Sequence, residues 1–182
     1  MVLRLLATFA VLATIQAATL ERLSLDDMTA KSSDIVRARV VATGITLRGS
    51  AARGMVYTTY TLDVSERLKG PSGKRMTVAV PGGSTVGLTQ TIAGSPVLKV
   101  GDEYVFFVWT SRSGLAQIIG LSQGLFNVLP DGKGSVNVSR SATPELMLDP
   151  VTGKAVADTS IRYGYQEMKS LVESRLAARA SQ

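Results

Sequence analysis

The chain has 182 residues and a formal net charge of +6, and it contains neither histidine nor cysteine. Without thiolate or imidazole ligands, ordinary zinc, copper, haem and iron–sulfur sites are excluded, and no disulfide can form. Serine–histidine and cysteine–histidine catalysis are excluded too, because no imidazole can take the proton of the nucleophile. The positive residues are spread along the chain, which indicates a solvated surface rather than a dedicated anion site.

Residues 1–18 have the pattern of a cleavable secretory signal peptide. Arg4 precedes an apolar run over Leu5–Ile15, and the small residues Ala17 and Ala18 suit a cleavage site. The run is shorter than the roughly 20 residues that a membrane-spanning helix needs. We therefore expect an exported protein, periplasmic or extracellular, with no transmembrane anchor after cleavage and no nucleic-acid partner.

Residues 19–182 have the size of a single domain with one core. Ser24, followed by Asp26 and Asp27, predicts a short helix with a side-chain cap at its start. Period-two alternation predicts strands over 34–45, with one solvent-exposed face, and over 55–69. The apolar and aromatic run over 104–109 is typical of a strand that is buried on both faces.

The remaining patterns complete a mainly β fold with terminal helices. The sheet is expected to span about 34–139, followed by a wrapping loop over 140–160 and an amphipathic helix over 161–179 that docks on the sheet. Short strands and tight turns predict a small antiparallel barrel, similar to the oligonucleotide/oligosaccharide-binding (OB) barrel, or a strongly twisted sheet.

One motif resembles a catalytic site. Residues 120–124 match G-x-S-x-G, the turn that presents the nucleophilic serine of α/β-hydrolases. Ser122 would have no histidine as its base, and a strand rather than a helix is expected after it, so we predict a bulge or a tight turn at Gly120 and Gly124. Serine–lysine chemistry remains open, with Ser65 near Lys69 and Ser72 near Lys74 as the nearby pairs. We predict no catalytic residue, no metal site and no cofactor.

Two glycine-rich loops, 46–54 and 82–96, are the candidate binding surface, because loops on a rigid scaffold often carry function. The candidate residues in them are Arg48, Arg53, Gly82, Gly83, Ser84 and Gln90. We expect a monomer that contacts a protein or a polysaccharide through these loops.

Several phrases resemble a family of exported bacterial proteins of unknown function over about residues 20–130. They are Leu68-Lys69-Gly70, Pro81-Gly82-Gly83, Gly101-Asp102 and Gln123-Gly124 followed by Phe126. The strand plan also resembles the netrin-like and metalloproteinase-inhibitor barrels, which use an N-terminal cysteine and disulfides that this chain lacks. The resemblance implies the fold rather than an activity. The long glycine-rich loops beside a catalytically poor core predict a non-enzymatic binding module. The alternatives are a regulator of a secreted protease and a histidine-free serine hydrolase.

Overall fold

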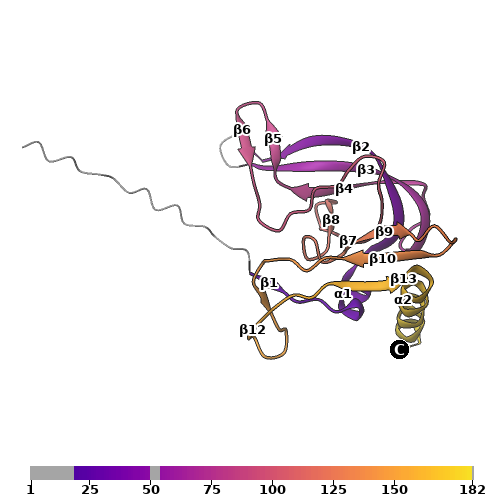
Figure 1. Cartoon of the computed structure of the whole chain (residues 1–182). Coiled ribbons are helices and arrows are strands. Elements are labelled where there is room, and N and C mark those ends of the chain that lie inside the picture. Colours follow the sequence, from indigo (N-terminus) through magenta and orange to yellow (C-terminus); the bar gives the residue numbers. More distant parts are fainter. Residues whose placement is uncertain (1–18, 50–53, 182) are drawn as a thin grey trace, which may run out of the picture.

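The computed structural model describes residues 19–49 and 54–181. The predicted signal peptide lies outside the described residues. Within the described ranges, no helix has the length and apolar character needed to cross a membrane. The fold is mainly β with two helices, as the sequence predicts (Figure 1).

The elements follow one another in a simple order along the chain. They are β1 (Leu20–Glu21), α1 (Leu25–Lys31), β2 (Asp34–Arg48), β3 (Met55–Lys69), β4 (Arg75–Pro81), β5 (Gly83–Thr85), β6 (Leu88–Gln90), β7 (Glu103–Thr110), β8 (Ala116–Ile118), β9 (Leu125–Pro130), β10 (Val136–Arg140), β11 (Met147–Leu148), β12 (Ala155–Val156), β13 (Ile161–Gly164) and α2 (Tyr165–Ala180).

The main sheet has eight strands in the order β13-β10-β9-β7-β2-β3-β4-β8, and β8 also pairs with β7. Five strands, β7, β2, β3, β4 and β8, therefore curl around a common interior. The parallel contact between β4 and β8 is a single residue pair, Ala79 with Gln117. The result is a strongly twisted, barrel-like sheet that is not fully closed.

Strand β7 separates two hydrophobic cores. Tyr104, Phe106 and Val108 point into the barrel interior. Val105 and Phe107 point to the opposite face, where α1 and α2 cover the sheet. We call this second core, with its two helices, the base; both helices lie at the bottom of Figure 1. The prediction of a strand buried on both faces is confirmed, except at Trp109, which is 46% exposed at the strand end.

Strand β2 differs from the prediction of one solvent-exposed face. Ile35 and Val36 are both fully buried, because the base covers one face of the strand and the barrel interior the other. Beyond a register shift between Val40 and Ala42, the strand leaves both cores. Residues 41–49 are all exposed.

The N-terminal helix forms as predicted. The Ser24 hydroxyl accepts a hydrogen bond from the Asp27 N–H at 3.1 Å, and the Asp27 carboxylate accepts one from the Ser24 N–H at 3.0 Å. This reciprocal pair is a capping box, which satisfies N–H groups that have no partner within the helix.

The C-terminal helix begins at Tyr165, four residues later than the predicted start at 161. Residues 161–164 form β13, which pairs antiparallel with β10, so the sheet extends past residue 139. Between them, the segment 140–160 holds the short strands β11 and β12, which form a small sheet with β1. A buried ion pair, Arg140 with Asp158 at 2.5 Å, fastens this segment to the end of β10.

Candidate binding groove

A groove of about 410 Å³ opens at the end of the barrel away from the helices. We call it the mouth groove. The ends of β3 and β4, the β5–β6 hairpin and the segment that follows the hairpin line it. The lining residues are Thr58, Tyr60, Val80, Pro81, Gly82, Gly83, Ser84, Thr89, Gln90, Thr91, Ile92, Ser95, Pro96 and Val97.

The lining of the mouth groove is uncharged and combines hydroxyl groups with apolar side chains. The Ser95 hydroxyl oxygen is buried and has no hydrogen-bond partner among the described residues. Buried polar groups in folded proteins nearly always have a partner, so a hydroxyl without one stands out among the groove residues. At the rim, Val97 is 85% exposed.

The structure brings together four of the six predicted binding residues, Gly82, Gly83, Ser84 and Gln90, in this lining. Arg48 is exposed at the end of β2 and does not line the groove. Arg53 lies outside the described residues. The basic side chains and the hairpin therefore do not form one described site.

Gly82 and Gly83 allow the backbone conformation that forms one side of the groove. Both have a positive φ, 103° and 138°, which side chains with a Cβ rarely adopt. A Cβ on Gly83 would lie 2.7 Å from the Thr58 hydroxyl oxygen. The two glycines allow β5 to approach the inner face of β3, and the Thr58 hydroxyl donates to the Gly82 carbonyl at 2.9 Å.

Gln90 has a structural contact that sequence reasoning does not show. Its Oε1 accepts a hydrogen bond from the Val56 N–H at 2.7 Å, and its Nε2 donates to the Gly54 carbonyl at 3.0 Å. The amide thus ties the hairpin to the start of β3. It holds the wall of the groove rather than offering free groups to a ligand.

Sequence reasoning missed the lining residues from β3, and it placed residues 91–96 in the candidate loop without naming any of them as a binding residue. Thr58 and Tyr60 belong to the clearest strand pattern, where inward-facing residues are expected to be core. The Tyr60 hydroxyl accepts a hydrogen bond from the Leu98 N–H at 3.4 Å. This contact holds the end of the segment 91–97. The one local signal was Val97, an apolar residue that follows a proline within a loop.

A second tyrosine holds the turn at residues 99–102, which follows the segment that lines the groove. The Tyr104 hydroxyl donates to Asp102 at 3.3 Å and accepts from the Lys99 N–H at 3.4 Å. Burial raises the pKa of Tyr104, and the neighbouring Asp102 carboxylate acts in the same direction, so this hydroxyl stays protonated over the ordinary pH range.

The G-x-S-x-G segment forms a tight turn between β8 and β9, as predicted. Gly120 and Leu121 both have positive φ, 61° and 59°. A Cβ on Gly124 would lie 2.6 Å from Ile119 Cγ2 and 2.9 Å from the Phe107 carbonyl oxygen. Gln123 is 1% exposed, and its amide accepts from the Leu23 N–H at 2.8 Å and donates to the Glu21 carbonyl at 2.9 Å. The motif residues thus shape and anchor a turn.

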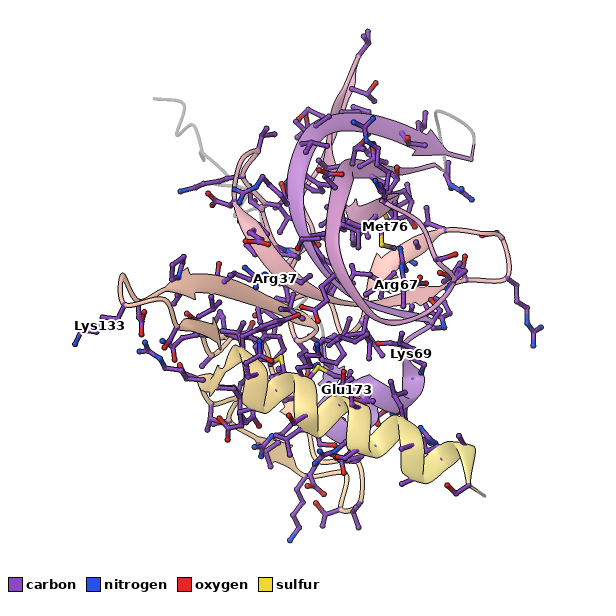
Figure 2. The ribbon with its side chains drawn as sticks, turned by 90° about the vertical axis from the view of Figure 1, so that its right-hand side faces the viewer. Arg37, Arg67, Lys69, Met76, Lys133 and Glu173 are labelled. Carbon is purple, nitrogen blue, oxygen red and sulfur yellow. The ribbon has the colours of Figure 1, made fainter. Side chains whose placement is uncertain are left out.

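A cluster of charged side chains lies where α2 docks on the outer face of β2 and β3. Glu66 accepts hydrogen bonds from the Tyr165 hydroxyl and from Lys169 Nζ, both at 2.6 Å. Arg37 binds Glu103 through two hydrogen bonds, at 2.9 and 3.1 Å, and its guanidinium carbon lies 4.8 Å from the centre of the Tyr165 ring. Figure 2 shows Arg37 on the strand ribbon above α2, which carries Glu173.

These contacts shift the acid–base properties of the docking residues. Burial opposes ionisation of Glu66, but the hydrogen bonds from Lys169 and Tyr165 outweigh it, and the pKa of Glu66 lies below its usual value. Burial, followed by the hydrogen bond to Glu66, raises the pKa of Tyr165. Since every charged member has a partner, the cluster fastens the helix.

In the ranges that the structure describes, no group of three or more carboxylates is placed to hold a metal ion. Comparison with models of known protein families finds no family that matches this chain. Comparison with curated proteins finds no relative either. The argument for function therefore rests on the groove itself.

Proposed function

We propose that this chain is a non-enzymatic, exported binding module of the bacterial envelope or secretome. Its ligand site is the mouth groove, which takes an uncharged stretch of a protein or polysaccharide. The observation that carries the proposal is the lining: hydroxyl groups and apolar side chains, no charged residue, and a buried Ser95 hydroxyl without a partner. Such a mixture of apolar surface with a few polar groups is typical of ligand sites.

The strand plan supports an OB-like assignment as part of this proposal. The curled strands follow the order β7-β2-β3-β4-β8, and β4 and β8 are parallel where the others are antiparallel. OB barrels are partly open five-stranded barrels that bind oligomers on the face of their second and third strands. Counted from β2, these strands are β3 and β4, which contribute Thr58, Tyr60 and Val80 to the groove.

The test is a binding screen of residues 19–182 against a glycan array and a library of uncharged peptides. NMR titration of the isotope-labelled chain with each hit should shift amides of residues 82–97 first. Val97→Arg places a charge at the rim and should weaken binding at least tenfold. Val151→Arg is the matched control, because Val151 is 91% exposed on the turn between β11 and β12 and does not line the groove.

The proposal fails if no glycan or peptide shifts the amides of the groove. It also fails if Val97→Arg and Val151→Arg bind every hit equally well.

A further inference from the structure

The second half of β2 presents an unpaired strand edge. Pairing with β7 ends at Arg39, which lies opposite Glu103, and Val40 adds two backbone hydrogen bonds to Gly101 and Asp102. Among the residues that the structure describes, 42–48 pair only with β3. In Figure 1 this half of β2 runs along the upper outline of the molecule. We call residues 42–48 the free edge.

The register identifies the backbone groups at this edge. The Gly82 N–H donates to the Val56 carbonyl. The backbone groups of even-numbered residues in this part of β3 therefore point toward β4, and those of odd-numbered residues point toward β2. Residues opposite those odd positions are the even-numbered ones of β2. Since hydrogen-bonding direction alternates along a strand, the groups that point away from β3 are the N–H and C=O of Thr43, Ile45 and Leu47.

Nothing in the described part of the chain covers these groups. Ile45 is 45% exposed and Leu47 37% exposed. Residues 42–47 include neither a charged residue nor a proline, two of the devices that protect a sheet edge from further pairing. At roughly 3.4 Å per residue, the free edge is about 24 Å long, enough to pair with a complete short strand.

Charge decides between the possible occupants. Arg39 lies three residues before the free edge and Arg48 lies at its far end, and both are exposed. Arg39 donates to the Gly101 carbonyl and lies 3.7 Å from Glu103, but its side chain remains 56% exposed. The chain as a whole carries a net charge of +6, so two copies repel one another. An extended segment with acidic residues at its ends instead matches both arginines.

We propose that the free edge binds an extended segment of a partner protein by strand addition. The segment has apolar residues at alternate positions and acidic residues at its ends. Ile45 Cδ1 lies beside Gly83, at the rim of the mouth groove, so inward side chains of the added strand face that rim. The inference deepens the proposed binding function by naming a protein partner, but it uses backbone groups outside the groove.

The test uses residues 19–182 and a nine-residue probe peptide, with valine and threonine alternating between aspartates at both ends. Amide exchange at Thr43, Ile45 and Leu47 should slow at least tenfold when the peptide is added. A peptide of the same sequence N-methylated at every amide should have no effect, because main-chain hydrogen bonds supply the affinity in strand addition.

Two variants separate backbone from side-chain effects. Thr43→Pro removes an edge N–H that β3 does not use and should weaken peptide binding at least tenfold. Thr43→Val keeps that N–H and should bind as the unchanged chain does. If Thr43→Pro does not fold, the exchange measurement on the unchanged chain still decides.

The inference is overturned if the peptide leaves the three amides unprotected, or if they are already protected in a dimer of the chain alone. Val97→Arg keeps the free edge intact, so it should retain peptide binding. If no ligand shifts the groove amides but the peptide protects the free edge, the groove proposal fails alone. If ligands bind in the groove but the peptide leaves the three edge amides unprotected, the strand-addition proposal fails alone.

Discussion

Two glutamines hold the chain in the same way at opposite ends of the molecule. Gln123 binds the Leu23 N–H and the Glu21 carbonyl in the base, and Gln90 binds the Val56 N–H and the Gly54 carbonyl at the mouth. In each case the amide pairs with the N–H of one residue and the C=O of the residue two positions earlier. In both places the glutamine side chain makes the backbone hydrogen bonds that a neighbouring strand would otherwise make.

The surroundings of the two amides differ. Gln123 is 1% exposed, so water cannot replace its hydrogen bonds. Gln90 is half-buried in a region that also carries Val86 and Val97, at 101% and 85% exposure. Identical chemistry therefore gives rigidity in the base and leaves the mouth able to exchange its contacts for water or ligand. The comparison teaches that the buried, fixed contacts lie at the base and the exchangeable ones lie at the mouth, where we propose the ligand site.

The strongest test of the comparison removes the buried ion pair that fastens the segment 140–160 to β10, beside the base. The side chains of Arg140 and Asp158 are 6% and 1% exposed. Arg140→Ala leaves a buried carboxylate without its partner, and we expect the free energy of unfolding in urea to fall by about 3–5 kcal/mol. Lys31→Ala, which breaks an exposed pair with Glu21, is the control and should cost less than about 1 kcal/mol. Equal losses would contradict a rigid base.

A smaller loss is expected from Gln123→Leu. The change leaves the Leu23 N–H and the Glu21 carbonyl without partners, and we expect a loss of about 2–3 kcal/mol in urea unfolding. Gln166→Leu, at an exposed position of α2, serves as the matched control and should change stability by less than about 0.5 kcal/mol. A loss below about 1 kcal/mol at Gln123 would show that the amide does not anchor the N-terminal segment.

The equivalent change at the mouth, Gln90→Leu, should cost about 1 kcal/mol or less, because water can reach the groups that it frees. Its main effect should be local: amide exchange at Val56 should become faster by about tenfold. If Gln90→Leu lowers the free energy of unfolding as much as Gln123→Leu does, the proposed difference between the two ends is wrong.

The smallest effect concerns pH. Because the pKa of Glu66 is lowered in the folded state, its contribution to stability is present above its ordinary value of 4.5 and is lost as the pH falls through the lowered pKa. Acidification below pH 4.5 should therefore loosen α2 before it affects the mouth, as measured by NMR shifts at Tyr165 and Lys169. In Glu66→Gln this early shift should disappear. If residues 82–97 loosen at the same pH as α2, the predicted order of loosening is wrong.

Local signals predicted a large part of the fold. Ser24 and Asp27 are close in sequence, and their capping box follows from residue type and spacing alone. The alternation in β3 and the apolar run in β7 were also readable, because these patterns depend only on the strand lying in a sheet and not on which strands pair with it. The late start of α2 was missed because Ile161 fits a helical face, while its pairing with Arg140 depends on a strand 21 residues earlier.

The candidate site was predicted only in part. Glycines and small polar residues marked the 82–90 hairpin as a loop that could bind, and four of its residues do line the groove. The role of Gln90 could not be read in advance, because its partners, Val56 and Gly54, are backbone groups more than 30 residues away. The exposure of both faces of β2 beyond Val40 could not be predicted either, because it depends on where β7, a strand distant in the sequence, ends.

The composition of the base bears on when the chain can fold. Its core joins Leu23 and Met28 of the first elements to Met168 and Val172 of the last helix, and an ion pair between Asp26 and Arg175 links α1 to α2. A ribosome must therefore release nearly the whole chain before this core can close. Such contacts between distant parts of a sequence form slowly. If the chain is exported as proposed, this delay keeps it unfolded, and so able to be threaded through a narrow translocation pore, until synthesis is nearly complete.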